Sequence, residues 1–287
     1  MLSNFWIIPI LPLAGFMVIG IMGLWRQCHS GQVLSRSVVY WVACGAVGLA
    51  FLASAWCFLE LVGLDHEHRV FEVDLFNWIN GNVIQTSAGE SIALNVSWGY
   101  QLDPLSSIFI LFITGIGFLI HIYSIGYMWD DEAGFWRFFS YLNLFMFMML
   151  TLVLSNNYLG LFVGWEGVGL CSYLLIGYYS HKKSAGDAAK KAFVVNRIGD
   201  FGFILGIFLL FSVFGTLDFT ELFEKLETMF PDPELAWGVL SWISLLLFVG
   251  ACGKSAQAPL YVWLPDAMEG HTPVSALIHA DTMITAG

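Results

Sequence analysis

Charged residues are scarce in this sequence. Only 11% of the 287 residues are Asp, Glu, Lys or Arg, less than half of the share of about 25% that is typical of soluble proteins. Hydrophobic residues make up 58%, and mean hydropathy is +0.74. A soluble fold of this length could not cover so much apolar surface with so few charges. The composition therefore excludes a soluble enzyme and a disordered chain, and it predicts an all-α polytopic membrane protein.

Basic residues and the common nucleotide-binding motifs are also lacking. Lys and Arg number 11 against 22 Asp and Glu, and the net charge of −11 argues against a nucleic-acid partner. No GxxxxGK[ST] motif is present, which excludes ATP-driven transport by this chain, and no GxGxxG motif follows a strand. The five cysteines show no CxxC spacing, so we expect them to pack as small hydrophobic residues. The sequence thus predicts no catalytic residue, metal site or cofactor site in this chain.

Long apolar segments set the predicted topology. A helix needs about 20 apolar residues to cross a bilayer core, and about eight segments meet this criterion: 5–25, 39–62, 104–127, 136–154, 158–179, 190–214, 236–264 and 272–287. The first lacks a basic flank and a clear cleavage site, so we expect a retained helix and not a removed signal. The last stops inside an apolar pattern, which favours a fragment of a longer protein.

The distribution of basic residues predicts the orientation. The loops after the odd-numbered spans hold most of them: Arg26, Arg36, Arg137, Lys182, Lys183, Lys190 and Lys191. The loops after the even-numbered spans hold only Arg69 and Lys225. Because positive loops stay on the cytoplasmic side, the N-terminus is predicted to lie outside.

Two of the outer loops are predicted to contain structure of their own. Alternating apolar residues in Val70–Leu75 and Ile92–Trp98 favour a β-hairpin within the long loop 63–101. Segment Phe219–Phe230 places its apolar residues on one face and most of its charges on the other, which predicts an amphipathic helix on the outer surface.

Glu166 is the first ionisable residue at membrane depth. It lies about nine residues into its span, about 13 Å deep at the helical rise of 1.5 Å per residue. Such a position costs at least about 2.5–3.5 kcal/mol. Its neighbours on the same helix face are Gly169, Tyr173 and Gly177, which let another helix or water approach. A proton-handling role and a buried structural ion pair both fit this position.

Lys254 is the second, and it lies just before a predicted helix break. Pro259 lacks an N–H and clashes with the preceding turn, while Gly250 and Gly253 loosen the helix before it. A break at membrane depth is tolerated only inside protein or beside a cavity. It is expected to leave free carbonyls near the ammonium group, as at transporter ion sites. The alternative is a kinked helix with a lysine that snorkels to the membrane surface.

Other ionisable residues are harder to interpret. Arg197 and Asp200 share a helix face and can pair locally, either as a structural salt bridge or as a functional pair. His121 and His279 lie in apolar stretches, where a histidine is commonly a core residue with satisfied hydrogen bonds. His279 is of more interest because it lies one helix beyond Lys254 and titrates near neutral pH.

Several motifs together resemble one known family, the largest antiporter-like subunits (chain 5) of respiratory complex I, NADH:quinone oxidoreductase. Their fifth membrane helix resembles the run Gly164-Trp165-Glu166-Gly167-Val168-Gly169-Leu170-Cys171-Ser172-Tyr173. Their broken seventh helix and the start of their eighth resemble Gly253-Lys254-Ser255-Ala256-Gln257, Trp263-Leu264-Pro265-Asp266-Ala267-Met268 and Thr272-Pro273-Val274-Ser275-Ala276-Leu277-Ile278-His279. The segment Asn196-Arg197-Ile198-Gly199-Asp200 is similar too. The resemblance covers essentially the whole chain.

The resemblance implies an antiporter-like fold in two parts. Residues 1–102 would form two N-terminal helices and a long external loop, and residues 103–287 the first antiporter-like repeat, broken near 250–260 and truncated in its eighth helix. Family members continue with a second inverted repeat and a long lateral helix, so a C-terminal part is missing here.

The resemblance further implies a proton-translocating role. Glu166 and Lys254 would form the coupling pair, His279 would continue the proton path and Asp200 would support the pair. Arg197, His121, Pro259 and Asp266 are the expected supporting residues. Because the redox chemistry lies in other subunits, this chain would be no enzyme alone.

The resemblance also implies where the chain works. FMN, iron–sulfur clusters and quinone are expected in partner subunits, and a neighbouring antiporter-like subunit is the expected contact. The expected location is the bacterial inner membrane, with the mitochondrial inner membrane as the less favoured setting. A sodium/proton antiporter subunit of the Mrp type and a structural membrane scaffold remain the alternatives.

Overall fold

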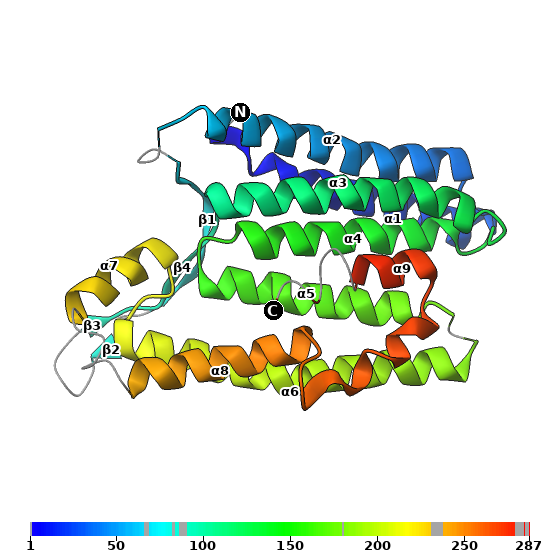
Figure 1. Cartoon of the computed structure of the whole chain (residues 1–287). Helices are drawn as coiled ribbons and strands as arrows, with labels where there is room; N and C mark the ends of the chain where they lie inside the picture. The colour runs from blue at the N-terminus through cyan, green and yellow to red at the C-terminus, as the bar shows by residue number, and fades with distance from the viewer. Residues whose placement is uncertain are drawn as a thin grey trace.

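The fold is a bundle of long helices with a small hairpin at one end (Figure 1), seen in a computed structural model. The structure describes residues 2–65, 69–81, 84–85, 91–179, 181–230, 238–278, 284 and 287. Six of its helices are long and apolar enough to cross a membrane: α1 Ile7–Ser30, α2 Arg36–Val62, α3 Pro104–Tyr127, α4 Phe135–Leu154, α5 Tyr158–Ile176 and α6 Lys183–Phe214. They correspond to the first six predicted spans, although α6 begins seven residues earlier than predicted because a polar turn extends it.

The six helices lie side by side, with α4 and α5 between α1–α3 and α6 (Figure 1). Helix α4 is the most buried of the six. Its Phe and Met residues surround the whole helix, as expected where every face meets another helix and not lipid. The other helices leave a broad apolar face exposed, which suits contact with lipid or with other membrane helices.

The long outer loop forms the predicted hairpin. Strands β1 Phe71–Asn80 and β4 Asn95–Leu102 pair in antiparallel fashion. Two short strands, β2 Ile84–Gln85 and β3 Ser91–Ile92, pair at the far end. Two isolated β-bridges, Tyr100–Ser155 and Asn157–Asp218, add to this β structure in an otherwise helical protein.

Polar side chains fix the hairpin to the bundle. Asn156, in the turn before α5, donates from Nδ2 to Asp74 Oδ1 at 3.0 Å. Ser97 of β4 donates to the same oxygen at 2.6 Å. The predicted amphipathic helix is α7 Phe219–Met229, which lies beside the hairpin (Figure 1). Its Thr220 hydroxyl donates to Glu72 of β1. The hairpin end of the bundle is therefore a structured cap.

The interruption predicted within the seventh span is present. Helix α8 runs from Val239 to Lys254, and short 3₁₀ turns follow, η3 Leu260–Trp263 and η4 Asp266–Glu269. At 1.5 Å per residue, α8 is about 24 Å long, shorter than the bilayer core of about 30 Å. The helix ends five residues before Pro259. Helix α9 begins the eighth span at Thr272 and is described to Ala276.

Glycine allows α8 to pack tightly on α6. A Cβ atom on Gly199 of α6 would lie 3.0 Å from the Cα atom of Gly253 on α8. A Cβ atom on Gly250 would lie 2.7 Å from Phe203 Cβ. Such close backbone approach is typical of small-residue contacts between membrane helices, and it holds the end of α8, with Lys254, against the middle of α6.

Candidate functional site

Four charged residues meet where α5, α6 and α8 pack together. Glu166 lies on α5, Arg197 and Asp200 on α6, and Lys254 is the last residue of α8. Glu166 and Lys254 interact electrostatically with each other and with both Asp200 and Arg197. With two carboxylates and two basic groups, the cluster carries no net charge when all four are ionised.

Lys254 is the most deeply buried member. Its side chain is 1% exposed, and no hydrogen-bond partner of its Nζ atom is found among the described residues. The ammonium group lies 5.7 Å from the centroid of the Trp165 ring, which supports it by a cation–π contact. A Cβ atom on Gly169 would lie 2.7 Å from Nζ, so the glycine makes room for the lysine.

Three carbonyls that directly precede Lys254 accept hydrogen bonds at the helix break. The Ser255 backbone N–H donates to Ala251 O at 2.8 Å, and that of Gln257 donates to Cys252 O at 2.9 Å. The buried indole of Trp263 donates to Gly253 O at 3.0 Å. The break is therefore capped by its own chain, and what it offers the ammonium is the negative end of the α8 dipole.

Glu166 pairs with Arg197 across the contact between α5 and α6. The local pair predicted between Arg197 and Asp200 is not formed among the described residues. The reason is tertiary, because the guanidinium extends toward the neighbouring helix and meets a carboxylate there. Its side chain is 46% exposed, against 18% for Glu166, so Arg197 is the member of the cluster that reaches the outer face of the bundle.

Trp165 contacts both Asp200 and Lys254, and sequence reasoning missed it. Its indole Nε1 donates to Asp200 Oδ1 at 2.7 Å in a buried hydrogen bond, while its ring lies beside Lys254. Asp200 is 2% exposed, and this bond keeps its carboxylate from being unsatisfied. The signal in the sequence was its position directly before Glu166, which places it on an adjacent face of α5.

Glu166 and Lys254 share the cluster, but the described ion-pair partner of Glu166 is Arg197. The basic group paired with the Glu166 carboxylate is thus a half-exposed arginine, whereas the Lys254 ammonium lies beside the Trp165 indole. This arrangement can move charge in steps: a displacement of Arg197 changes the field at Glu166, and Glu166 in turn acts on Lys254. Because Lys254 is shielded from water, each such change acts on it strongly.

The remaining predicted site residues lie elsewhere or outside the described residues. His121 is buried between α3 and α4, where Nδ1 lies 2.7 Å from Gly117 O and Nε2 lies 3.4 Å from Asn143 Nδ2, as in a structural histidine. Asp266 is half-exposed and pairs with Lys191 of α6 at 2.7 Å. Pro259 precedes η3. His279 lies outside the described residues.

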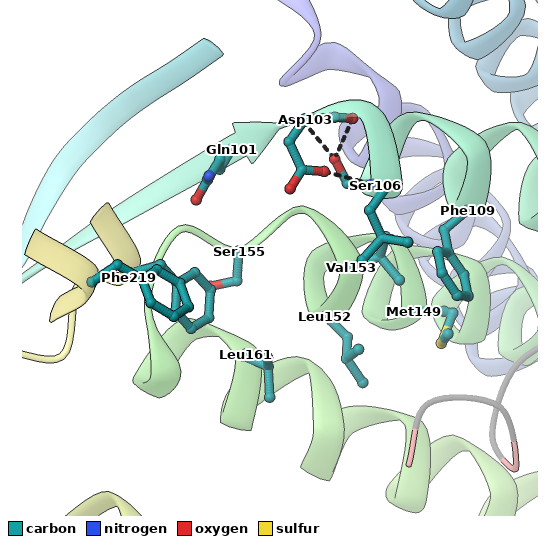
Figure 2. Close-up of a pocket in the computed structure, with 12 residues that line it drawn as sticks. Gln101, Asp103, Ser106, Phe109, Met149, Leu152, Val153, Ser155, Leu161 and Phe219 are labelled. Atoms are coloured by element: carbon teal, nitrogen blue, oxygen red, sulfur yellow. Dashed lines mark hydrogen bonds between the residues drawn. The ribbon is translucent and has the colours of Figure 1, made fainter. Parts of the chain in front are cut away.

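A cavity of about 280 Å³ at the hairpin end of the bundle is separate from this cluster. It lies between β4, α3, α4, α5 and α7, and its lining is mostly apolar (Figure 2). Its Asp103 and Ser106 already bond to each other, because Asp103 caps the start of α3. None of the four clustered residues lines it.

Two family descriptions match parts of the chain. Residues 155–287 match "NADH:quinone oxidoreductase/Mrp antiporter, TM", and residues 90–139 match "NADH-Ubiquinone oxidoreductase (complex I), chain 5 N-terminus". The first match contains all four residues of the buried cluster.

Curated relatives match nearly the whole chain. The NADH-quinone oxidoreductase subunit L of Mycobacterium tuberculosis (strain H37Rv) is 48% identical over 282 residues, which is 98% of this chain and 40% of the relative. The subunit of the same name from Escherichia coli (strain K12) is 44% identical over 97% of this chain and 41% of its own length. The chain thus spans about two fifths of the length of these relatives.

Solved structures show a similar fold. The Mrp complex from Dietzia sp. DQ12-45-1b matches with a TM-score of 0.69 and 25% identity, over 97% of this chain and 27% of that one. The membrane-bound sulfane sulfur reductase, an archaeal respiratory membrane complex, matches with a TM-score of 0.75 over 99% of this chain and 51% of that one. At 18% identity, the second likeness concerns the fold alone.

Proposed function

This chain belongs to the family of antiporter-like membrane subunits of NADH:quinone oxidoreductase, respiratory complex I, and on that premise we propose that it forms part of a proton-translocating subunit. Its integral membrane character follows from its six apolar spans. The proposal concerns the step in which redox energy released elsewhere in the complex drives a proton across the membrane.

One observation carries the proposal: a lysine held 1% exposed at a helix end inside the bundle, with a carboxylate on each of two neighbouring helices. Burying a lysine at membrane depth costs about 2.5–3.5 kcal/mol or more. A scaffold would gain more from an apolar residue of similar size at this position, since buried ion pairs are weak sources of stability. The cluster is therefore better explained by work that requires a lysine to gain and lose a proton.

The geometry supports a stepwise mechanism. In the resting state Arg197 holds Glu166, while Trp165 and the α8 dipole stabilise the Lys254 ammonium. A charge change in a neighbouring subunit reaches Arg197 first, because that side chain is half-exposed on the outer face. When Arg197 leaves Glu166, the free carboxylate draws the ammonium away from the Trp165 ring and the end of α8. When the Arg197–Glu166 pair re-forms, the displaced ammonium has neither these supports nor the carboxylate, and Lys254 releases its proton.

Partners and location follow from the same proposal. The flavin, iron–sulfur clusters and quinone would be bound by partner subunits. The neighbour that acts on Arg197 would be another antiporter-like subunit, and the membrane would be a bacterial inner membrane with the N-terminus outside. The excess of basic residues in the loops after the odd-numbered spans supports this orientation.

An Mrp-type sodium/proton antiporter subunit would use a similar buried cluster. The relatives named NADH-quinone oxidoreductase subunit L are 43–48% identical to this chain, whereas the Mrp complex matches at 25%. Identity therefore favours the complex I subunit.

The test is to purify the full-length protein from its native membrane with whatever is bound to it. The proposal predicts flavin and iron–sulfur absorbance in the preparation, NADH oxidation with a quinone acceptor, and proton uptake that stops when NADH is exhausted. Sodium-dependent proton exchange in vesicles that lack these redox subunits would instead support the antiporter and overturn the proposal.

A further inference from the structure

A second buried ionisable residue lies outside the four-residue cluster. His271 immediately precedes α9 and is 2% exposed. Neither of its ring nitrogens has a hydrogen-bond partner among the described residues. An unsatisfied buried polar atom costs about 1–3 kcal/mol, so a histidine that only filled space here would be a poor choice beside an apolar side chain. An orphaned buried group of this kind calls for a functional explanation.

Aromatic rings enclose the imidazole on several sides. The nearest is Tyr179, with 4.2 Å between ring centroids, followed by Tyr178 at 4.9 Å. Phe138 of α4 lies at 5.3 Å and Tyr127 of α3 at 5.7 Å, both edge-on. Tyr178 and Tyr179, which follow α5, thus cover one side of the imidazole.

A cavity whose lining includes charged side chains lies beside the two tyrosines. Its volume is about 350 Å³, and Tyr178 and Tyr179 line it together with Asp131, Arg137 and His181. The Tyr178 hydroxyl donates to Asp131 Oδ2 at 2.9 Å, which fixes that ring. The Tyr179 ring is held by ring contacts with Tyr178 and His181 and by the exposed Lys182, whose ammonium lies 4.7 Å from its centroid, and no hydrogen bond of its hydroxyl is found among the described residues. Tyr179 is therefore the ring that can move aside to connect cavity and histidine.

The residue before the histidine lies against the end of the helix that carries Glu166. A Cβ atom on the preceding Gly270 would lie 3.4 Å from Ile176 Cα at the end of α5. Ten residues separate Ile176 from Glu166 along that helix, which is about 15 Å. The imidazole thus lies between a cavity at the end of the bundle and the interior that leads to the buried cluster.

We propose that His271 is a proton-loading site, which takes a proton from water in the cavity when Tyr179 moves aside and passes a proton inward. One ring nitrogen accepts a proton from a hydronium ion in the cavity, which leaves as water, while the other nitrogen releases its proton to a water molecule on the inner side. One proton is thus transferred, and the ring ends neutral in its other tautomer. This inference rests on the proposed function, because a loading site has a purpose only where protons are translocated.

The surrounding charges suit such a site. Burial lowers the pKa of His271 to about 4, with Asp131 opposing this shift and Lys182 reinforcing it. The titratable groups that face the ring are Tyr127 from α3, Asp131 from the following loop, and Tyr178, Tyr179 and Lys182 from the segment after α5. Phe138 from α4 brings no charge. At neutral pH the imidazole is therefore neutral while Tyr179 covers it, and one of its nitrogens is free to accept a proton.

The test uses the full-length subunit in its assembled complex, reconstituted in liposomes, with protons translocated per NADH oxidised as the readout. His271→Gln keeps a polar side chain but cannot carry a proton, and we expect it to lower the ratio as much as Lys254→Ala does. The matched control is His29→Gln, which changes an exposed histidine at the end of α1 and should leave the ratio at the wild-type value.

A rescue experiment separates proton transfer from packing. In His271→Gly, added imidazole should restore the ratio, whereas pyrazole, which has the same shape but is a much weaker base, should not. Rescue by both compounds, or by neither, would assign His271 a packing role and overturn the inference. Wild-type pumping by His271→Gln beside a defective Lys254→Ala would also overturn it and leave the proposed function intact. Wild-type pumping by Lys254→Ala would instead refute the proposed function itself.

Discussion

The close contact between α6 and α8 gives a prediction whose size can be worked out from the structure. In Gly199→Ala, the new methyl group would lie 3.0 Å from Gly253 Cα, 3.2 Å from Val249 O and 3.3 Å from Gly250 O. All three are backbone atoms, so no side chain can rotate away. The two helices must separate by a few tenths of an ångström, or the helix must bend.

Overpacking of this kind costs about 1–3 kcal/mol. Replacing glycine with alanine within a helix returns about 1 kcal/mol, so the net expectation is a protein about 1 kcal/mol less stable. The matched control is Gly186→Ala in the same helix, where no other atom lies within 4 Å of the new methyl group. That variant should be about 0.5–1 kcal/mol more stable than wild type.

Unfolding of the purified chain in mixed detergent micelles with increasing SDS, followed by tryptophan fluorescence, measures both variants. We expect their free energies of unfolding to differ by about 2 kcal/mol, with Gly199→Ala the weaker. In the assembled complex, Gly199→Ala should also lower proton translocation, because it displaces Gly253 and with it Lys254. Equal stability of the two variants would refute the close helix contact and the placement of Lys254 that depends on it.

Two further predictions concern single charges. Arg197→Gln should lower the number of protons translocated per NADH oxidised, because Glu166 loses its described ion-pair partner. Arg197→Lys should keep most of that number. Wild-type pumping by Arg197→Gln would show that the arginine has no part in the mechanism. The pKa of Asp218 is raised by burial and by the nearby Glu72 and Asp74 carboxylates. The folded protein therefore favours the protonated side chain. Its contribution to the free energy of unfolding is full at low pH and is lost as the pH rises through the raised pKa. Asp218→Asn should therefore raise the SDS unfolding midpoint at pH 7 and lose that advantage below pH 4, and an advantage that does not change with pH would contradict this reasoning.

The spans could be predicted well because apolar length is a local property. The ranges predicted for α3 and α4 agree with the structure to within a residue. The break near 250–260 could be predicted from Gly250, Gly253 and Pro259, and α8 ends at Lys254 within that range. The hydrogen bond from the Trp263 indole to the Gly253 carbonyl could not be predicted, because local sequence rules do not place side chains ten residues apart.

The site could be predicted in its members but not in its connections. Spacing places Arg197 beside Asp200, yet the crossing of α5 and α6 brings it to Glu166 instead. The roles of Trp165 and His271 depend on several helices at once, because each touches residues far away in sequence. Sequence reasoning identifies charges that are costly to bury, whereas their partners depend on how the helices cross.

The central claim is that Lys254 carries the translocated proton. Its most direct test is the number of protons translocated per NADH oxidised by the assembled complex with Lys254→Ala, measured in sealed liposomes with NADH oxidation recorded in parallel. The account predicts an assembled complex that still oxidises NADH but translocates fewer protons for each NADH. A ratio equal to that of the wild type, in a complex that assembles to the same extent, would contradict it.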